Sequence, residues 1–224
     1  MVAARFDSYK TNNNFIIFAS GVSNSKNTDT AAYDRETTLL KETTKIHKEK
    51  TLVYFSTCSI YDPGETDSLY IIHKREIEEY IRENAGHFHI FRVSNLVGKS
   101  GNQNTVLNFF YYHIQHKINF DLWDNSTRNL IDTDDMFTIT DHILKVKLFQ
   151  NQIINIANPV SYTVKDIIAA LEITLDIKAN YISISKGSPF SIDISLILPL
   201  IRKLNIHFSE SYLTDLIKKY YLRQ

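Results

Sequence analysis

A short apolar run, Thr51-Leu-Val-Tyr-Phe55, leads into the hydroxyl-rich segment Ser56-Thr-Cys-Ser59, and Tyr70-Ile-Ile-His-Lys74 then opens a second pattern. Apolar runs of this length are typical of strands that are buried on both faces of a sheet. From Tyr70 to Asn84, apolar and charged residues alternate at helical spacing. A buried strand followed by a helix is the repeating unit of α/β proteins, so this stretch predicts a parallel sheet.

The same alternation continues on both sides of this stretch. Short apolar runs predict further strands at Phe15–Ala19, His87–Val93 and Ile153–Ala157, and helical patterns cover 31–48, 105–116, 164–175 and 209–221. We expect an α/β protein with a parallel sheet flanked by helices and a small C-terminal lobe. The core would span 1–93 with parts of 94–160, and the lobe would share 94–224 with it. A single domain over 1–224 is the alternative.

Composition narrows the class of protein. Of the 224 residues, 43% are hydrophobic, which is enough for a packed core. Basic and acidic residues balance at 25 each, so we expect no nucleic-acid partner. A single cysteine, Cys58, excludes an intramolecular disulfide framework and a cysteine-rich zinc site. Neither an apolar run of membrane-spanning length nor a signal-peptide pattern is found, so we expect a cytoplasmic protein with no membrane partner.

Tyr70 and Lys74 lie one helical turn apart and therefore share one face of their helix. A phenol has a pKa near 10, too high for an efficient base at neutral pH, and a nearby ammonium would lower it. Thr57, close to the end of the preceding strand, is placed to hydrogen-bond the same substrate oxygen. The trio predicts proton transfer at a substrate hydroxyl while a hydride leaves or joins the same carbon. For Tyr-x-x-x-Lys alone, an exposed pair without function is the alternative.

Further segments follow in a characteristic order. Val53-Tyr-Phe-Ser-Thr-Cys-Ser-Ile-Tyr61 precedes the Tyr70–Lys74 motif; after it come Phe91-Arg-Val-Ser-Asn-Leu-Val-Gly98, Arg128-Asn-Leu-Ile-Asp-Thr-Asp-Asp135 and Ile154-Asn-Ile-Ala157. Together these segments resemble the extended short-chain dehydrogenase/reductase family, which includes NAD-dependent nucleotide-sugar epimerases and dehydratases. In that family the catalytic Ser or Thr stands four residues before the tyrosine that ends the strand segment, and Thr57 stands four before Tyr61.

The resemblance implies a Rossmann-like fold and assigns roles to residues. Tyr70 would be the catalytic acid/base, Lys74 would lower its pKa, and Thr57 would orient the substrate oxygen. The implied cofactor is NAD or NADP, bound by Ala19, Ser20, Gly21 and Lys74, and the implied substrate is a nucleotide-activated sugar, bound by Asn95, Arg128 and Ser59. The planar, permanently charged Arg128 suits a nucleotide diphosphate. The implied setting is surface-polysaccharide synthesis, and the helix of Tyr70 is implied at a homodimer interface.

One motif of the family is not found in the chain. The family holds the cofactor pyrophosphate on a Gly-x-x-Gly-x-x-Gly loop after its first strand. The six glycines, Gly21, Gly64, Gly86, Gly98, Gly101 and Gly187, do not form this motif. Residues 15–20 resemble the family's fourth strand, so we expect an N-terminally truncated sheet, with Val2–Phe6 as the tail of the first helix.

Three explanations of the missing loop remain open. The chain is a fragment or has a misassigned start, it is a shortened protein without cofactor binding, or it binds the cofactor in an unusual way. Two functions therefore remain open. The protein is an NAD(P)-dependent epimerase, dehydratase or reductase, or it is a non-catalytic binding or subunit protein.

Three other groups of residues are candidates for a metal site. His87-Phe-His89 and the pair His113 and His116 lack a third ligand at suitable spacing. Asp132-Thr-Asp-Asp135 lacks the glycine and distal glutamate of a calcium loop, and we expect it to be the acidic start of a helix. No metal site is predicted. Trp123 is expected on a hairpin of the C-terminal lobe.

Overall fold

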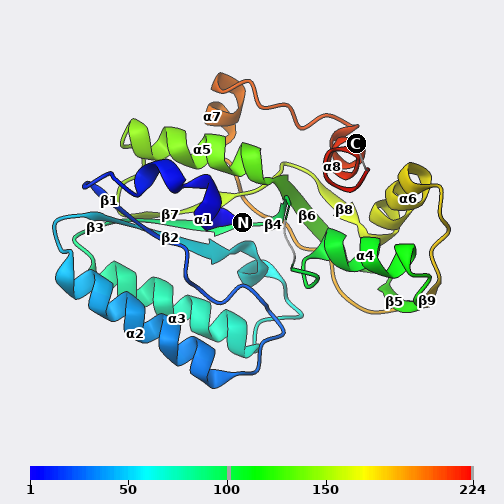
Figure 1. Ribbon diagram of the computed structural model, residues 1–224, viewed down its shortest axis with the longest axis horizontal. Helices are drawn as coiled ribbons and strands as arrows, with labels where there is room; N and C mark the ends of the chain where they lie inside the picture. Colours follow the sequence, from blue (N-terminus) through cyan, green and yellow to red (C-terminus); the bar gives the residue numbers. More distant parts are fainter. Residues whose placement is uncertain (100–101, 223–224) are drawn as a thin grey trace.

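The computed structural model describes residues 1–99 and 102–222. Its main sheet has four parallel strands in the order β1-β2-β3-β7. These strands are β1 (Phe15–Phe18), β2 (Thr51–Thr57), β3 (His87–Val93) and β7 (Gln152–Ile156). Figure 1 shows helices on both faces of this sheet. The predicted α/β architecture, a parallel sheet flanked by helices, is therefore confirmed.

Helices α2 (Thr30–Ile46) and α3 (Leu69–Asn84) cover one face of the sheet. Their inward side chains pack against alternate residues of the strands, and the core on this face contains Phe18, Leu40, Leu52, Tyr54, Ile77, Ile81, Phe88 and Ile90. Each helix starts at a side-chain cap, which satisfies a backbone N–H that has no partner within the helix. Asp29 caps α2 and Ser68 caps α3. The Ser68 cap places Tyr70 and Lys74 in the first two turns of α3.

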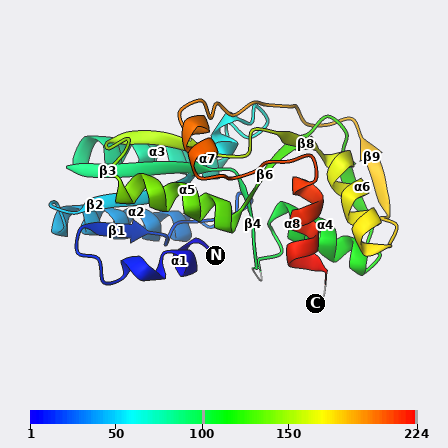
Figure 2. The ribbon, with the colours of Figure 1, turned by 90° about the horizontal axis from the view of Figure 1, so that it is seen from above.

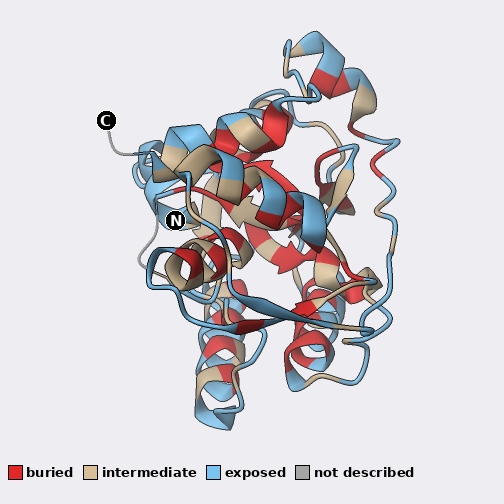
Figure 3. Ribbon diagram, turned by 90° about the vertical axis from the view of Figure 1, so that its right-hand side faces the viewer, coloured by how far each residue is buried: buried red, intermediate tan, exposed pale blue. Residues whose placement is uncertain are grey.

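The opposite face of the sheet is covered by α1 (Val2–Arg5), a 3-10 helix (Asp7–Tyr9), α5 (Thr133–Lys145) and α7 (Leu198–Lys203). Phe6 packs between the rings of Phe55 and Phe137, with ring centres 5.1 and 5.0 Å away. The N-terminal segment is thereby fastened to both the sheet and α5. Figure 3 shows that buried residues gather on the strands and on the inward faces of the helices.

The lobe lies beside the sheet and follows its carboxyl end (Figure 2). Its small sheet has the order β4-β6-β8, and β5 pairs in parallel with β9. The strands are β4 (Asn95–Val97), β5 (Phe120–Trp123), β6 (Thr127–Asp132), β8 (Ser161–Thr163) and β9 (Tyr181–Ile184). The helices are α4 (Val106–Gln115), α6 (Val164–Leu175) and α8 (Tyr212–Tyr221).

The predicted hairpin around Trp123 is wrong. Trp123 ends β5, and β5 pairs in parallel with β9 from much later in the chain. A hairpin joins consecutive antiparallel strands, so a local turn cannot produce this pairing.

Over residues 1–99 and 102–222, every helix is too short or too polar to cross a bilayer.

Candidate functional site

Thr57, Tyr70 and Lys74 meet where β2 ends and α3 begins. Thr57 is the last residue of β2, and Tyr70 and Lys74 lie on the buried face of α3. The Thr57 side chain lies within hydrogen-bonding reach of Tyr70, and Lys74 Nζ lies 5.8 Å from the centre of the Tyr70 ring. All three residues are more than nine-tenths buried, with exposed fractions of 7%, 7% and 2%. The structure thus brings together the trio that the sequence singled out.

The Lys74 ammonium is paired with Glu36, a residue of α2. Lys74 Nζ donates to Glu36 Oε1 at 3.1 Å and to the Tyr54 hydroxyl at 2.7 Å, and Tyr54 donates to the same Glu36 oxygen at 2.7 Å. The other carboxylate oxygen accepts the Val22 N–H at 2.6 Å. His73 Nε2 lies 3.0 Å from it, close enough for ion pairing but not aligned as a hydrogen bond. We call Glu36, Tyr54, His73 and Lys74 the Glu36 cluster.

Burial and charge together set the protonation of the Glu36 cluster. Burial by itself would raise the pKa of Glu36, but its contacts with His73, Lys74, Tyr54 and the Val22 N–H outweigh burial and lower the pKa to about 2. Burial lowers the pKa of Lys74, while Glu36 opposes that shift. Burial and the neighbouring Glu36 charge raise the pKa of Tyr54 well above its usual value. Glu36 is therefore ionised at neutral pH and gives Lys74 its counter-charge.

Tyr70 is held as a neutral phenol. Burial raises its pKa, the hydrogen bond with Thr57 partly offsets this, and Glu36 and Tyr33 raise it further, to about 12. The sequence predicted that Lys74 would lower this pKa. In this structure the pKa of Tyr70 is instead raised, and Lys74 is engaged by Glu36 and Tyr54.

Among the predicted cofactor residues, Gly21 lies against the Glu36–Lys74 pair. A Cβ atom at Gly21 would stand 2.6 Å from Glu36 Oε1 and 2.9 Å from Lys74 Nζ. Any larger residue would therefore displace one of these two groups. Ala19 and Ser20 precede Gly21 at the end of β1, half-buried and exposed respectively. The structure thus joins Gly21 and Lys74, which were assigned to one site from segments far apart in sequence.

The predicted substrate residues lie where the sheet meets the lobe. Ser59 donates its backbone N–H to Thr57 Oγ1 at 3.0 Å, so it is next to the trio. Asn95 begins β4, and its side chain donates to the Asn129 carbonyl at 3.0 Å. Arg128, on β6, lies 4.0 Å from Asp62, which follows β2. Burial lowers the pKa of Arg128, and the charge of Asp62 opposes this. Arg128 is thus brought to the connection that carries Ser59.

A second ionic group lies one strand away from the trio. Arg92 of β3 binds both oxygens of Glu78, at 2.9 Å through Nε and 2.5 Å through Nη2. Ser56 also donates to Glu78, at 2.5 Å. Ser56 is therefore engaged in this pair, which separates it from Thr57, its neighbour in the sequence. Burial raises the pKa of Cys58 to about 12, so it remains a thiol.

Glu36, Tyr54 and His73 were not predicted as site residues from the sequence. One signal was present for Glu36: it shares a helix face with Leu40, four residues later, which is fully buried. A carboxylate on the apolar face of a helix requires a buried cationic partner. The identity of that partner is a long-range contact, and the helical pattern alone does not contain it.

The acidic segment Asp132–Asp135 starts α5, as predicted. Asp132 is the N-cap and accepts the Asp134 N–H at 2.8 Å. Lys219 of α8 donates to Asp132 and to Asp134, both at 2.7 Å. From the same helix, Tyr220 donates to Asp132 and Tyr212 to Asp135, also at 2.7 Å. We call these residues the Asp132 cluster. In residues 1–99 and 102–222, His, Cys, Asp and Glu side chains form no group of three that could hold a metal ion.

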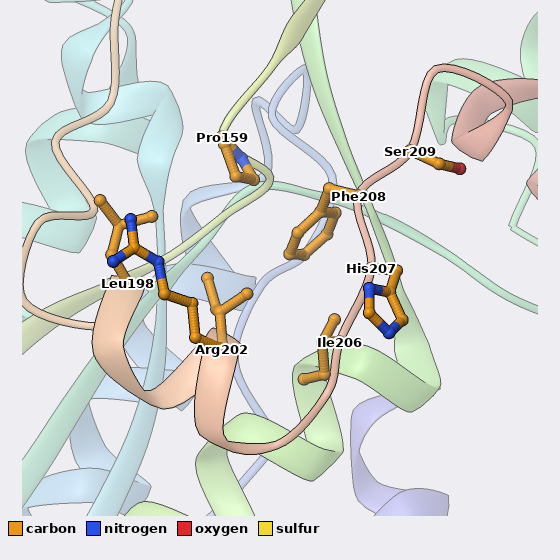
Figure 4. Close-up of a pocket in the computed structure, with 8 residues that line it drawn as sticks. Pro159, Leu198, Arg202, Ile206, His207, Phe208 and Ser209 are labelled. Carbon is orange, nitrogen blue, oxygen red and sulfur yellow. The ribbon is translucent and has the colours of Figure 1, made fainter.

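A cleft of about 320 Å³ lies between α7 and the segment that leads to α8 (Figure 4). It is lined by Pro159, Leu198, Ile201, Arg202, Ile206, His207, Phe208 and Ser209. This lining is mostly apolar and contains none of the predicted site residues. The cleft is therefore separate from the trio at the end of β2.

The fold and the trio together define an α/β protein of the extended short-chain dehydrogenase/reductase type. A family model described as the NAD dependent epimerase/dehydratase family matches residues 14–157, and the chain belongs to that family. A search of curated proteins finds no match to this sequence.

Solved structures share the fold at low sequence identity. The UDP-glucose 4-epimerase of Thermus thermophilus, determined with NAD, is 14% identical, with a TM-score of 0.71 over 96% of this chain and 79% of that one. The UDP-glucose 4-epimerase of Thermotoga maritima, with UDP-glucose, is 17% identical, with a TM-score of 0.70 over 93% and 77%. The dTDP-glucose 4,6-dehydratase of Bacillus anthracis, with NAD, is 16% identical, with a TM-score of 0.68 over 92% and 71%.

Proposed function

We propose that this protein is an NAD(P)-dependent enzyme that epimerises, dehydrates or reduces a nucleotide-activated sugar in the cytoplasm, as a step of surface-polysaccharide synthesis. The observation that carries the proposal is the buried contact between Thr57 and Tyr70, with Lys74 one turn further along α3. Family membership and the ligands of similar structures, UDP-glucose and NAD, support the same substrate and cofactor classes.

In this proposal Tyr70 exchanges a proton with a sugar oxygen that Thr57 holds. Since its pKa is about 12, Tyr70 carries its proton at neutral pH and is prepared to donate it to a carbonyl oxygen. Transfer in the opposite direction requires a phenolate, which a closer Lys74 ammonium would stabilise. NAD or NADP, when bound, supplies the hydride donor or acceptor.

The residues of this chain fit the reacting end of the dinucleotide. Lys74 has three N–H donors, of which Glu36 and Tyr54 engage two, so one is left for a ribose hydroxyl. Gly21, beside Lys74, leaves room for a close backbone approach. The pyrophosphate end has no match, because the chain contains no Gly-x-x-Gly-x-x-Gly loop. Ala19 and Ser20 would line the cofactor next to Gly21.

The lobe would hold the nucleotide sugar. Arg128 offers a fork that matches a diphosphate, and its described ion pair, with Asp62, has the long distance of 4.0 Å. Asn95 and Ser59 lie on the segments that follow β3 and β2, at the carboxyl edge of the sheet, where ligands of such sheets bind. We therefore propose that residues of the core perform the reaction and that residues of the lobe select the substrate.

The test is a comparison of Tyr70→Phe with the wild-type chain, assayed with nucleotide sugars and with NAD, NADH, NADP and NADPH. Removing the acid/base should reduce turnover by about 10²–10⁴-fold. Tyr80→Phe makes the same chemical change on the same helix, away from the trio, and should leave turnover unchanged. Full activity in Tyr70→Phe would show that the site is assigned incorrectly.

A non-catalytic nucleotide-sugar-binding or subunit protein is the second candidate. It is favoured by the pairing of Lys74 with Glu36. Calorimetric titration distinguishes the two candidates: the second candidate binds UDP-glucose but neither NADH nor NADPH, and it has no turnover.

For either candidate we propose a homodimer that forms through α2 and α3, whose Leu39, Leu69 and Ile72 are at least 39% exposed. Sedimentation equilibrium measures that assembly.

A further inference from the structure

We propose that Glu36 is the positioning residue of this site: its carboxylate holds the Lys74 ammonium beside Gly21 and so prevents Lys74 from stabilising the Tyr70 phenolate. The proposal rests on the proposed function for its catalytic meaning. The control of Lys74 and Tyr70 by Glu36, a residue of another helix, can be measured without any turnover.

The Glu36 carboxylate is buried and is contacted by residues from several elements of the site. Its exposed fraction is 0%, and both carboxylate oxygens have partners. Oε1 accepts from Lys74 and Tyr54, and Oε2 accepts from the Val22 N–H and faces His73. These partners come from α3, β2 and the segment after β1. Since the carboxylate cannot move without losing several of them, it fixes the place of Lys74 Nζ.

Packing alone does not explain this arrangement. A buried ion pair is often no more stabilising than apolar side chains of the same volume, because both charges lose their hydration. Here the pair also restricts Gly21, since a Cβ atom there would stand within 3 Å of both Glu36 Oε1 and Lys74 Nζ. A pair that offers little stability and constrains its surroundings is best explained by what it does to Lys74.

The position of Lys74 matters for Tyr70. Lys74 Nζ is 5.8 Å from the centre of the Tyr70 ring but 2.7 Å from the Tyr54 hydroxyl. The Glu36 charge opposes ionisation of Tyr70 directly and also neutralises the nearby ammonium. Without that charge, the ammonium would be balanced less well and would favour the Tyr70 phenolate.

Other titratable groups face this pair and stay in place in the experiment. They are Tyr33 from α2, Tyr54 from β2, and His73 and Glu78 from α3. Tyr33 and Glu78 act on Tyr70 and Lys74 only through their charge, and a substitution at position 36 leaves both unchanged. A shift in Tyr70 therefore reports on Glu36 and Lys74.

The experiment is a pH titration of Tyr70 in the full chain, labelled with ring-carbon-13 tyrosine and assigned by the signal that Tyr70→Phe removes. Glu36→Gln keeps the size of the side chain, and its single amide oxygen can still accept from Val22 or from Tyr54, which bond to different oxygens of Glu36. We expect it to increase the acid dissociation constant of Tyr70 about tenfold or more. Glu42→Gln, at an exposed position of the same helix, should leave it unchanged. An unchanged or smaller constant in Glu36→Gln would overturn the proposal.

Glu36→Asp covers the case in which Glu36→Gln does not fold. It keeps the charge, so Lys74 retains a counter-ion, but it is one methylene shorter and cannot reach Lys74 and Val22 together. The Tyr70 dissociation constant should again increase, by less than in Glu36→Gln, and no change would overturn the proposal. A shifted Tyr70 in a chain without turnover would refute the proposed enzyme while supporting this inference, and turnover with an unshifted Tyr70 would do the reverse.

Discussion

The Glu36 cluster and the Asp132 cluster each combine a lysine with at least one carboxylate and one tyrosine, but they differ in burial. The Lys74 side chain is 2% exposed and that of Glu36 is 0% exposed. Lys219 is 44% exposed, and water reaches part of the Asp132 cluster. In the first cluster each charge depends on its partner because no water can replace it. In the second, water can substitute for a lost partner.

This difference separates two uses of ion pairs. A fully desolvated pair shifts proton affinities and is costly to break on one side, which suits a group that tunes chemistry. A half-exposed ion pair contributes little to stability but orients its side chains, which suits a contact that joins two helices. The Asp132 cluster joins α8, at the end of the chain, to the start of α5. We infer that burial, and not residue type, decides which use applies.

The largest effect should come from breaking the buried pair on one side. Lys74→Met leaves the Glu36 carboxylate buried without a cation, and we expect the free energy of unfolding to fall by about 3–5 kcal/mol. Urea denaturation measures it. The double variant Glu36→Gln/Lys74→Met removes both charges and should recover most of the loss. If Lys74→Met alone were as stable as the wild type, the buried cluster would behave like the exposed one and the comparison would fail.

Acid should act on the same cluster with the next largest effect. The pKa of Glu36 is lowered from 4.5 to about 2 in the folded chain, so between these values the unfolded chain binds more protons. The stabilisation by Glu36 is therefore complete above pH 4.5 and is lost as the pH falls toward 2. We expect the stability difference between wild type and Glu36→Gln to shrink by up to roughly 3 kcal/mol over this range. A difference that does not depend on pH would contradict the pKa assignment.

The two clusters also show what local sequence contains. The strands of the main sheet and helices α2, α3 and α6 follow from apolar periodicity, and Tyr70 and Lys74 follow from spacing on one helix. Glu36 was not predicted, because its partners come from β2, α3 and the segment after β1, and no local pattern relates them. The parallel pairing of β5 with β9 was missed for the same reason. Local spacing predicts which face of a helix or strand is buried, whereas the element that packs against this face depends on the folded chain.

Breaking the exposed cluster should have a smaller effect. Lys219→Met removes contacts to Asp132 and Asp134, and we expect a loss of about 1 kcal/mol or less. The loss should diminish at high salt, since the cluster is open to screening. Lys218→Met, the neighbouring exposed lysine, is the matched control and should cost less. A salt-independent loss as large as that of Lys74→Met would show that water does not replace the lost partner.

The smallest expected effect has the opposite sign to that of Glu36. Burial raises the pKa of Asp135, the hydrogen bond from Tyr212 partly offsets this, and Asp132 raises the pKa further. Between the usual value of 3.8 and the raised value, the folded chain binds more protons than the unfolded one. The contribution of Asp135 is thus most favourable below pH 3.8 and is lost as the pH rises through its folded pKa.

Asp135→Asn stays neutral at every pH and can still accept from Tyr212. The stability of wild type relative to Asp135→Asn should therefore decrease as the pH rises, whereas relative to Glu36→Gln it should increase. Urea denaturation at several acidic pH values measures both slopes in one series. Equal signs would mean that the half-exposed carboxylate is stabilised in its ionised form as Glu36 is, and the contrast between the two clusters would then be one of degree only.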